Sequence, residues 1–239
     1  MVYLTADLHG DLDRLREAEK KLRRKDTLIV LGDFGFLWSG DKAERKLLRR
    51  LGKRKYTLLF LDGAHENFDL LEEYPIVEYQ GGRARQLGER LYQLMRGECY
   101  TIGGHSILCM GGGESEDMLD REEGHTWWRQ ELPSEEEMDH CRETLAARRG
   151  KVDYILTHTP PYRLRRFLIG EEAETNRLET FLDEIAQSAD YRCWYFGRCH
   201  IDRAIGAKAT AVYRKVIPMW EEPKKSIFRR GEKRQEEKV

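Results

Sequence analysis

Short apolar runs alternate with stretches in which apolar residues recur at helical spacing. The runs predict β-strands at residues 2–6, 27–31, 56–61, 91–96, 99–102, 106–110, 152–157, 191–196 and 210–217. Apolar residues three or four positions apart predict amphipathic helices around 12–22, 47–51 and 178–185. Strands that alternate with helices in this way are typical of an α/β fold with parallel strands.

The middle of the chain departs from this alternation. The runs at 91–96, 99–102 and 106–110 follow one another closely and predict antiparallel strands. Gly103 and Gly104 separate the last two runs and predict the turn of a hairpin.

Residues 114–150 are charged, and we predict that they form a mostly helical insertion. Ser134 and Glu137 have the spacing of a capping box that would begin a helix. Neither an internal repeat nor a linker divides the chain, so we predict a single domain over residues 1–222. The polar tail at 223–239 is predicted to be disordered.

The composition changes this picture only by limiting partners and location. The 42 basic and 43 acidic side chains nearly cancel, so no overall field attracts nucleic acid or acidic membranes. No run approaches the roughly 20 apolar residues of a membrane span, and the start of the chain lacks a signal-peptide pattern. The five cysteines form no CxxC pair, which favours reduced thiols and a cytoplasmic location.

Several predicted strands end in histidine or aspartate. These residues are Asp7 and His9, Asp33, His65, His158 and His200. Ligands of α/β sheets bind at the carboxyl ends of the strands. Imidazole suits zinc, iron and similar ions, and carboxylates add hard oxygen ligands. Any one of these residues alone is better explained as a turn, a cap or a surface group. Together, each after its own strand, they predict a metal site.

The same segments resemble the ordered motifs of calcineurin-like metallophosphoesterases. They are Asp7-Leu8-His9, Gly32-Asp33, Gly63-Ala64-His65-Glu66, His158 and Gly197-Arg198-Cys199-His200. The resemblance covers residues 2–220 and implies an α/β fold, a four-layer α/β/β/α sandwich of two mixed sheets flanked by helices. It also implies two divalent metal ions, often manganese, iron or zinc, and hydrolysis of a phosphate-ester substrate by metal-activated water.

The resemblance further implies a role for each residue. The first metal ion would be held by Asp7, His9, His200 and Asp33. Asp33 would also bridge to a second ion, for which His158 would be a ligand. His65 would lie beside the scissile phosphate, where it would stabilise charge or protonate the leaving oxygen.

Two positions differ from the family pattern, and both belong to the second metal ion. Ala64 stands where the family has asparagine, and it offers no donor atom. Arg198 stands where the family has histidine, and a guanidinium has no free lone pair. We therefore expect one tightly bound ion, manganese first with iron or zinc as alternatives, and a second that is weak or absent.

The leading interpretation is a phosphatase or phosphodiesterase that works with one metal ion. Arg198 and His65 would act directly on the phosphate, because a forked guanidinium suits phosphate oxygens. The activity would be reduced or lost if Ala64 and Arg198 impair the site. The sequence does not choose between a phosphomonoester and a phosphodiester substrate.

Three alternatives fit the same pattern. A binding or scaffold module could retain the fold without catalysis, because fold does not fix function. A nuclease could hold a strand with the tryptophans at 127–128 and the arginines at 163–166, although the net charge does not indicate a nucleic-acid partner. Ala64 and Arg198 could also be engineered replacements in an ordinary two-metal enzyme.

Overall fold

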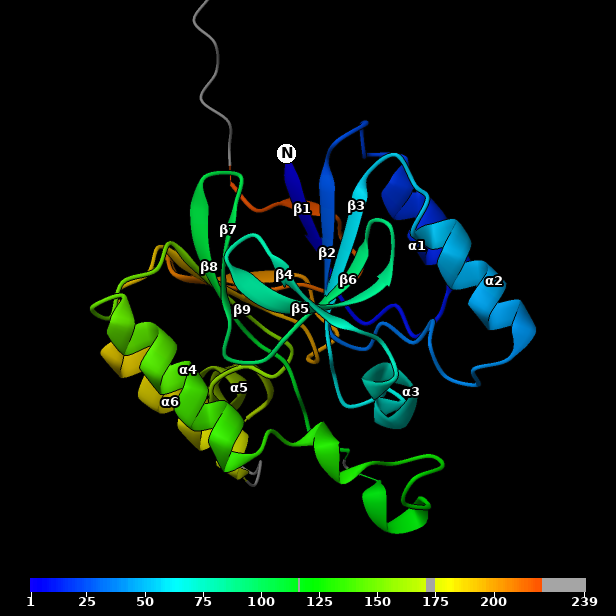
Figure 1. Cartoon of the computed structure of the whole chain (residues 1–239). Coiled ribbons are helices and arrows are strands. Elements are labelled where there is room, and N and C mark those ends of the chain that lie inside the picture. The colour runs from blue at the N-terminus through cyan, green and yellow to red at the C-terminus, as the bar shows by residue number, and fades with distance from the viewer. Residues whose placement is uncertain (116, 171–174, 221–239) are drawn as a thin grey trace, which may run out of the picture.

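Two mixed β-sheets lie face to face, with helices on their outer faces (Figure 1). The computed structural model describes residues 1–115, 117–170 and 175–220. The tail predicted to be disordered, 223–239, lies outside these residues. The result is the four-layer α/β/β/α sandwich expected from the sequence.

The first sheet is built mainly from the N-terminal half of the chain, in the order β13-β1-β2-β3-β6-β5-β4. Its strands are β1 (Val2–Thr5), β2 (Thr27–Leu31), β3 (Thr57–Leu61), β4 (Ile76–Tyr79), β5 (Gly82–Gly88), β6 (Leu91–Leu94) and β13 (Ile217–Pro218). The strands β1, β2, β3 and β6 are parallel, whereas β13, β5 and β4 pair antiparallel with their neighbours.

The second sheet has the order β11-β12-β10-β9-β8-β7. Its strands are β7 (Cys99–Ile102), β8 (His105–Met110), β9 (Tyr154–Thr157), β10 (Cys193–Phe196), β11 (Arg203–Ile205) and β12 (Ala209–Ala211). The four central strands β12, β10, β9 and β8 are parallel, and the edge strands β11 and β7 are antiparallel.

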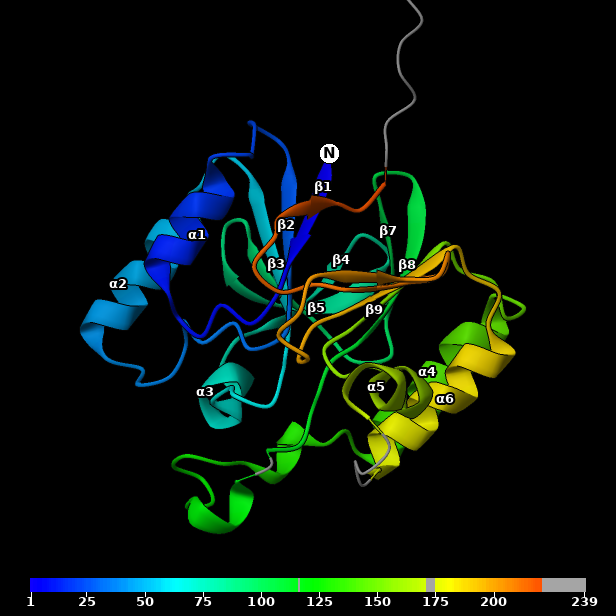
Figure 2. The ribbon, with the colours of Figure 1, turned by 180° about the vertical axis from the view of Figure 1, so that it is seen from behind.

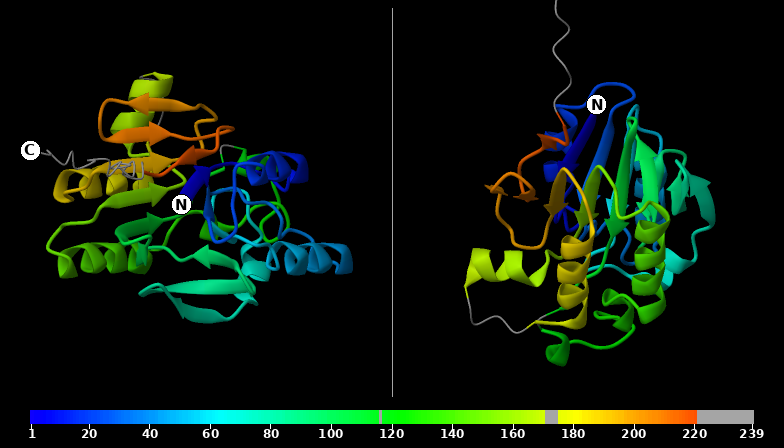
Figure 3. Two further views of the ribbon diagram at one scale, coloured as in Figure 1. Left: turned by 90° about the horizontal axis from the view of Figure 1, so that it is seen from above. Right: turned by 90° about the vertical axis from the view of Figure 1, so that its left-hand side faces the viewer.

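The helices divide between the two outer faces. Those against the first sheet are α1 (Leu12–Glu19), α2 (Lys42–Leu51) and α3 (Phe68–Glu72). Those on the side of the second sheet are α4 (Glu135–Ala147), α5 (Tyr162–Ile169) and α6 (Arg177–Ser188). Figure 3 shows the two groups of helices on opposite sides of the strands. No helix of the described residues is long and apolar enough to cross a bilayer.

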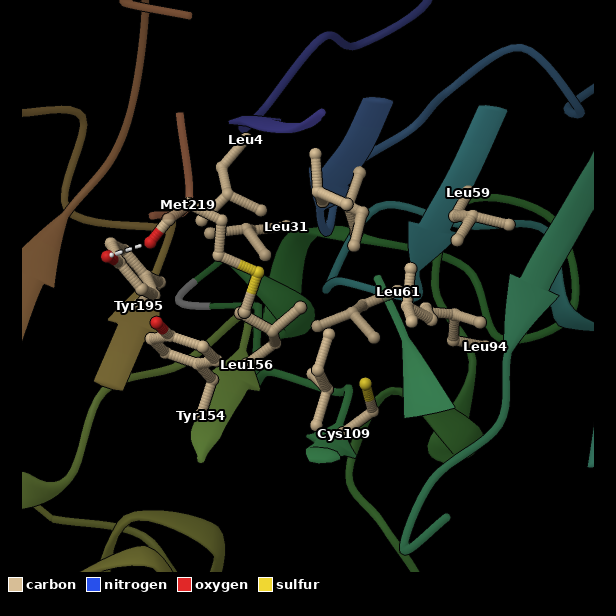
Figure 4. Close-up of a cluster of buried hydrophobic side chains, with 14 of the residues drawn as sticks. Leu4, Leu31, Leu59, Leu61, Leu94, Cys109, Tyr154, Leu156, Tyr195 and Met219 are labelled. Atoms are coloured by element: carbon tan, nitrogen blue, oxygen red, sulfur yellow. Dashed lines mark hydrogen bonds between the residues drawn. The ribbon is translucent and has the colours of Figure 1, made fainter. Parts of the chain in front are cut away.

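The alternation of side chains along each strand explains the layers. In β2, Ile29 and Leu31 point between the sheets, while Leu28 and Val30 point toward the helices. The inter-sheet core contains Leu156 and Tyr195 of the second sheet, and the Tyr195 hydroxyl donates a 2.7 Å hydrogen bond to the Met219 carbonyl (Figure 4). Strands buried on both faces in this way read as continuous apolar runs in the sequence.

The strand predicted at 210–217 is wrong as a single element. The structure divides it into β12 of the second sheet and β13 of the first. The carboxylate of Asp202 causes the break, because it accepts backbone N–H groups of Tyr213, Arg214 and Lys215 at 2.9–3.2 Å. Those amides therefore serve a turn instead of a strand ladder.

The middle of the chain also differs in part from its prediction. The hairpin of β7 and β8 forms as expected, but β6 belongs to the other sheet. The insertion expected to be mostly helical is helical from Glu135 onward, where Ser134 and Glu137 form the predicted capping box. Before it, residues 117–134 contain only two short 3-10 helices, η1 (Met118–Asp120) and η2 (Arg129–Glu131).

Candidate metal centre

Loops from both sheets converge at the carboxyl ends of their parallel strands. Figures 1 and 2 show the ends of β1, β2 and β3 close to the end of β9, with the green segment after β8 below them. A pocket of about 430 Å³ opens there. Its described lining is His9, Asp33, Ala64, His65, Glu114, Ser115, Asp117, Arg121, His158, Arg198 and His200. The sheet topology thus brings the strand-end motifs of the sequence to one place.

Much of this site is held in left-handed backbone conformation. The residues with positive φ are Asp7 (51°), His9 (47°), Asp33 (49°), Arg198 (60°) and His200 (51°). Such angles are uncommon outside glycine and cost about 1–3 kcal/mol each. Residues in this conformation cluster at functional sites, which supports a functional role for these loops.

The ligand atoms lie within reach of common ions in three overlapping groups. They are Asp7 with His9 and His200, Asp7 with Asp33 and His158, and Asp33 with His9 and His65, with ligand atoms no more than 4.8 Å apart in each. The first group contains three of the four residues that the family resemblance assigns to the first ion, and the fourth, Asp33, occurs in the other two groups. Nδ1 of His65 lies 3.1 Å from Oδ2 of Asp33.

Two buried ligand atoms have no hydrogen-bond partner among the described residues. Nδ1 of His158 donates to the Leu31 carbonyl at 2.9 Å, because a carbonyl can only accept, and this leaves Nε2 with a bare lone pair. Nε2 faces Oδ1 of Asp33 at 3.5 Å, and Oδ2 of Asp7 is also without a partner. A cation between these acceptors would satisfy both of them, so the residues fit a divalent ion.

The charges of the buried groups fit a cation as well. Burial, and then the neighbouring Asp33 carboxylate, raise the pKa of Asp7 to about 8. Burial lowers the pKa of His158, which keeps its imidazole neutral and able to coordinate. Burial acts against the ionisation of Asp33, but His158, His65 and His9 outweigh it and hold its pKa well below the usual range.

Two glycines of the motifs allow the backbone to pack closely against the candidate ligands. A Cβ on Gly63 would lie 2.1 Å from Oδ1 of Asp33, and one on Gly32 would lie 2.2 Å from Nδ1 of His158. Gly32 also has a φ of +84°. Gly32 and Gly63 are therefore required because the backbone at these positions lies close to a candidate ligand side chain.

The two positions that depart from the family pattern lie together. The side chain of Arg198 donates to the Glu114 carbonyl at 2.5 Å, and its backbone N–H donates to Oδ1 of Asp7 at 3.2 Å. A Cβ placed on Gly113 would lie 2.5 Å from Nη1 of Arg198 and 3.2 Å from both Ala64 Cβ and His158 Cδ2. The guanidinium is therefore next to the residues that the family uses for its second ion.

Sequence reasoning missed the groups that support the ligands. The Tyr213 ring stacks on His200 with centroids 4.6 Å apart, and the Arg14 guanidinium lies 4.9 Å from the Tyr213 ring. Arg14 also donates to the carbonyls of Ala6 and Asp7. No pattern pointed to Tyr213, because it comes from the turn that the strand prediction obscured.

Glu66, the acid of the third motif, is hydrogen-bonded to the loop that follows Asp33. Its buried carboxylate accepts the Phe34 N–H at 2.7 Å and so holds the loop that follows Asp33. The helix α3 begins later, with Asn67 as its N-cap. Glu66 of the third motif thus stabilises the loop of the second motif, Gly32-Asp33.

Three residues outside the candidate ligand set have structural contacts or remain protonated. Trp128 is buried and its indole N–H donates to Asp69 at 2.9 Å, which fits packing rather than stacking on a base. Arg165 forms a 2.6 Å ion pair with Glu179. Burial raises the pKa of Cys199 to about 11, so its thiol stays protonated and is a poor metal ligand.

Comparison with known families agrees with this geometry. The family model for calcineurin-like phosphoesterases matches residues 1–197. The match includes the first four motifs and stops immediately before Arg198 and His200. No curated protein matches the chain.

Proposed function

The chain belongs to the calcineurin-like phosphoesterase family, and from this premise we propose that it hydrolyses phosphomonoesters or phosphodiesters with one tightly held divalent ion. The family acts on phosphate esters with divalent metals. The finer proposal is that Asp7, His9, Asp33 and His200 hold the ion, with manganese the first choice and iron or zinc the alternatives.

The bare carboxylate oxygen of Asp7 carries this proposal. Among the described residues, Oδ2 of Asp7 is buried without a hydrogen-bond partner. A buried polar atom without a partner costs about 1–3 kcal/mol, and more when it is charged. Coordination removes that cost, and the buried carboxylates of Asp7 and Asp33 supply the negative charge that an ion needs.

The residues divide the remaining work between them. A divalent ion bound here supplies Lewis-acid activation of water and of a phosphoryl oxygen. The Arg198 guanidinium donates to the phosphate oxygens on the side where the family has a second ion. His158 orients the phosphate on the same side as Arg198, and His65 lies beside the scissile phosphate.

Metal content and turnover test the proposal together. Mass spectrometry of the purified protein should find about one ion per chain, and p-nitrophenyl phosphate or its bis ester should be hydrolysed when manganese is added. Asp7→Asn should lose the ion and the turnover. Asp13→Asn, which changes an exposed carboxylate on α1 that is paired with Arg16, should lose neither.

Other outcomes would redirect the assignment. Bound metal without hydrolysis of either ester, under manganese, iron or zinc, would contradict the enzyme and favour a binding module. Turnover that persists in Asp7→Asn would show that the ion is held by other residues.

A further inference from the structure

A second arginine reaches the same pocket from the segment between β8 and α4. Nη2 of Arg121 lies 3.0 Å from Nε2 of His65. Its Nε pairs with Oδ1 of Asp117 at 2.8 Å, and its Nη1 donates to the Thr126 carbonyl at 3.1 Å. Arg121 lines the pocket together with Arg198. Sequence reasoning did not single out Arg121, because its segment has no periodic pattern.

The hydrogen bonds of His65 show which ring nitrogen carries the proton. Nδ1 lies 3.1 Å from Oδ2 of Asp33, and since an ionised carboxylate only accepts, Nδ1 carries the proton. Nε2 then accepts from Arg121, which has no acceptor atom of its own. The imidazole is thus held between the Asp33 carboxylate and the Arg121 guanidinium, which is itself paired with Asp117.

The segment that carries Arg121 is held by hydrogen bonds at Gln130 and Glu131. The Arg96 guanidinium donates to the Gln130 carbonyl at 2.6 Å, and the Gly113 N–H donates to the Glu131 carbonyl at 2.9 Å. The Glu131 carboxylate accepts the Ser115 N–H at 3.0 Å. These buried contacts join both ends of the segment, so Arg121 is presented to the pocket by an anchored loop.

We propose that Arg121 is a second phosphate-binding cation, which works with Arg198 and selects phosphomonoester dianions over phosphodiesters. This inference deepens the proposed function and rests on it for the identity of the substrate. Two guanidiniums provide paired donors for two phosphoryl oxygens. A monoester carries one more negative charge and one more unesterified oxygen than a diester, so it gains more from the second cation.

Binding of inorganic phosphate to the metal-loaded protein tests Arg121 without requiring turnover. Isothermal titration should show that Arg121→Met and Arg121→Gln each weaken phosphate binding by about 10- to 100-fold, the usual range for one hydrogen bond to a charged group. Arg121→Lys should recover part of this loss, because it keeps the charge without the fork. Arg129→Met is the matched control, because Arg129 is on the same segment, mostly exposed and paired with Glu123.

Kinetics then tests the selectivity. For p-nitrophenyl phosphate, Arg121→Met should raise KM or lower kcat/KM by at least tenfold more than for the bis ester. Metal content and circular dichroism of each variant should match the wild type, and the second neutral variant serves if the first does not fold.

Three results would overturn the proposal. The first is wild-type phosphate affinity in both neutral variants, and the second is tighter phosphate binding in them, which would mean that Arg121 blocks the site. The third is an equal loss of kcat/KM for the two esters. If the wild type hydrolyses neither ester but the variants still bind phosphate more weakly, the proposed function fails while the phosphate site stands.

Discussion

Replacing Arg96 by methionine should destabilise the protein more than replacing any exposed arginine. Arg96 lies just after β6 with only 5% of its side chain exposed, and its partner Asp62 is fully buried. Nη2 and Nε of Arg96 lie 2.6 and 2.8 Å from Oδ2 of Asp62. Nη1 contacts Glu137 at 2.9 Å, and Nη2 also donates to the Gln130 carbonyl at 2.6 Å.

The magnitude follows from what the substitution leaves behind. Methionine keeps most of the apolar stem, but among the described residues it leaves the buried Asp62 carboxylate with Gln93 Nε2, at 3.0 Å, as its one side-chain donor. Breaking a buried pair in this way costs about 3–5 kcal/mol, a large part of the 5–15 kcal/mol that stabilises a typical domain. Removing both charges with Asp62→Leu and Arg96→Met should cost less than Arg96→Met alone, because Glu137, the acid then left without Arg96, is 40% exposed to water.

Urea denaturation followed by circular dichroism measures these differences. Arg16→Met is the control, since Arg16 is 59% exposed and its 2.6 Å pair with Asp13, itself 86% exposed, is a surface contact that contributes about 0–1 kcal/mol. A loss in Arg96→Met that is no larger than in Arg16→Met would refute the reasoning. So would a double variant less stable than Arg96→Met.

Three further predictions concern the metal centre. The double variant Ala64→Asn with Arg198→His should bind two ions per chain by mass spectrometry, and a single ion would show that these positions are wrongly assigned. Because burial and the Asp33 carboxylate raise the pKa of Asp7 to about 8, metal and proton compete for Asp7. Metal affinity should therefore rise by up to about tenfold per pH unit below 8 and level off above it, with proton release below 8 measurable by titration calorimetry in two buffers. Gly63→Ala should lower metal content, because its Cβ would lie 2.1 Å from Oδ1 of Asp33, and full occupancy in that variant would contradict the requirement for glycine.

The ends of the strands were predictable because their signals are local. Each ligand follows an apolar run directly, and parallel strands bring their carboxyl ends to one edge. The fold follows from the same alternation, since β2 and β3 read as continuous apolar runs and are buried on both faces. The order of the strands is a different matter, because nothing local places β6 beside β3 and away from β7.

The features that sequence reasoning missed depend on contacts between distant segments. The strand β4 has no apolar run, because as an edge strand it is largely exposed, with Ile76 48% accessible. Tyr213 reaches His200 only because Asp202 turns the chain between β12 and β13. Arg121 reaches His65 across an irregular segment whose course is set by Arg96 and not by periodicity.

The surroundings of Arg198 argue for replacement of one cation by another rather than simple loss of a metal site. A site that had only decayed would not need to hold a guanidinium at that point, yet the Glu114 carbonyl binds it at 2.5 Å. Gly113 and Ala64 leave the space that it enters, since a Cβ on Gly113 would come within 2.5 Å of Nη1. His158 meanwhile keeps a bare Nε2 on the side of Asp33. A guanidinium stays charged at any physiological pH, so this side of the pocket is positive whether or not a second ion is supplied.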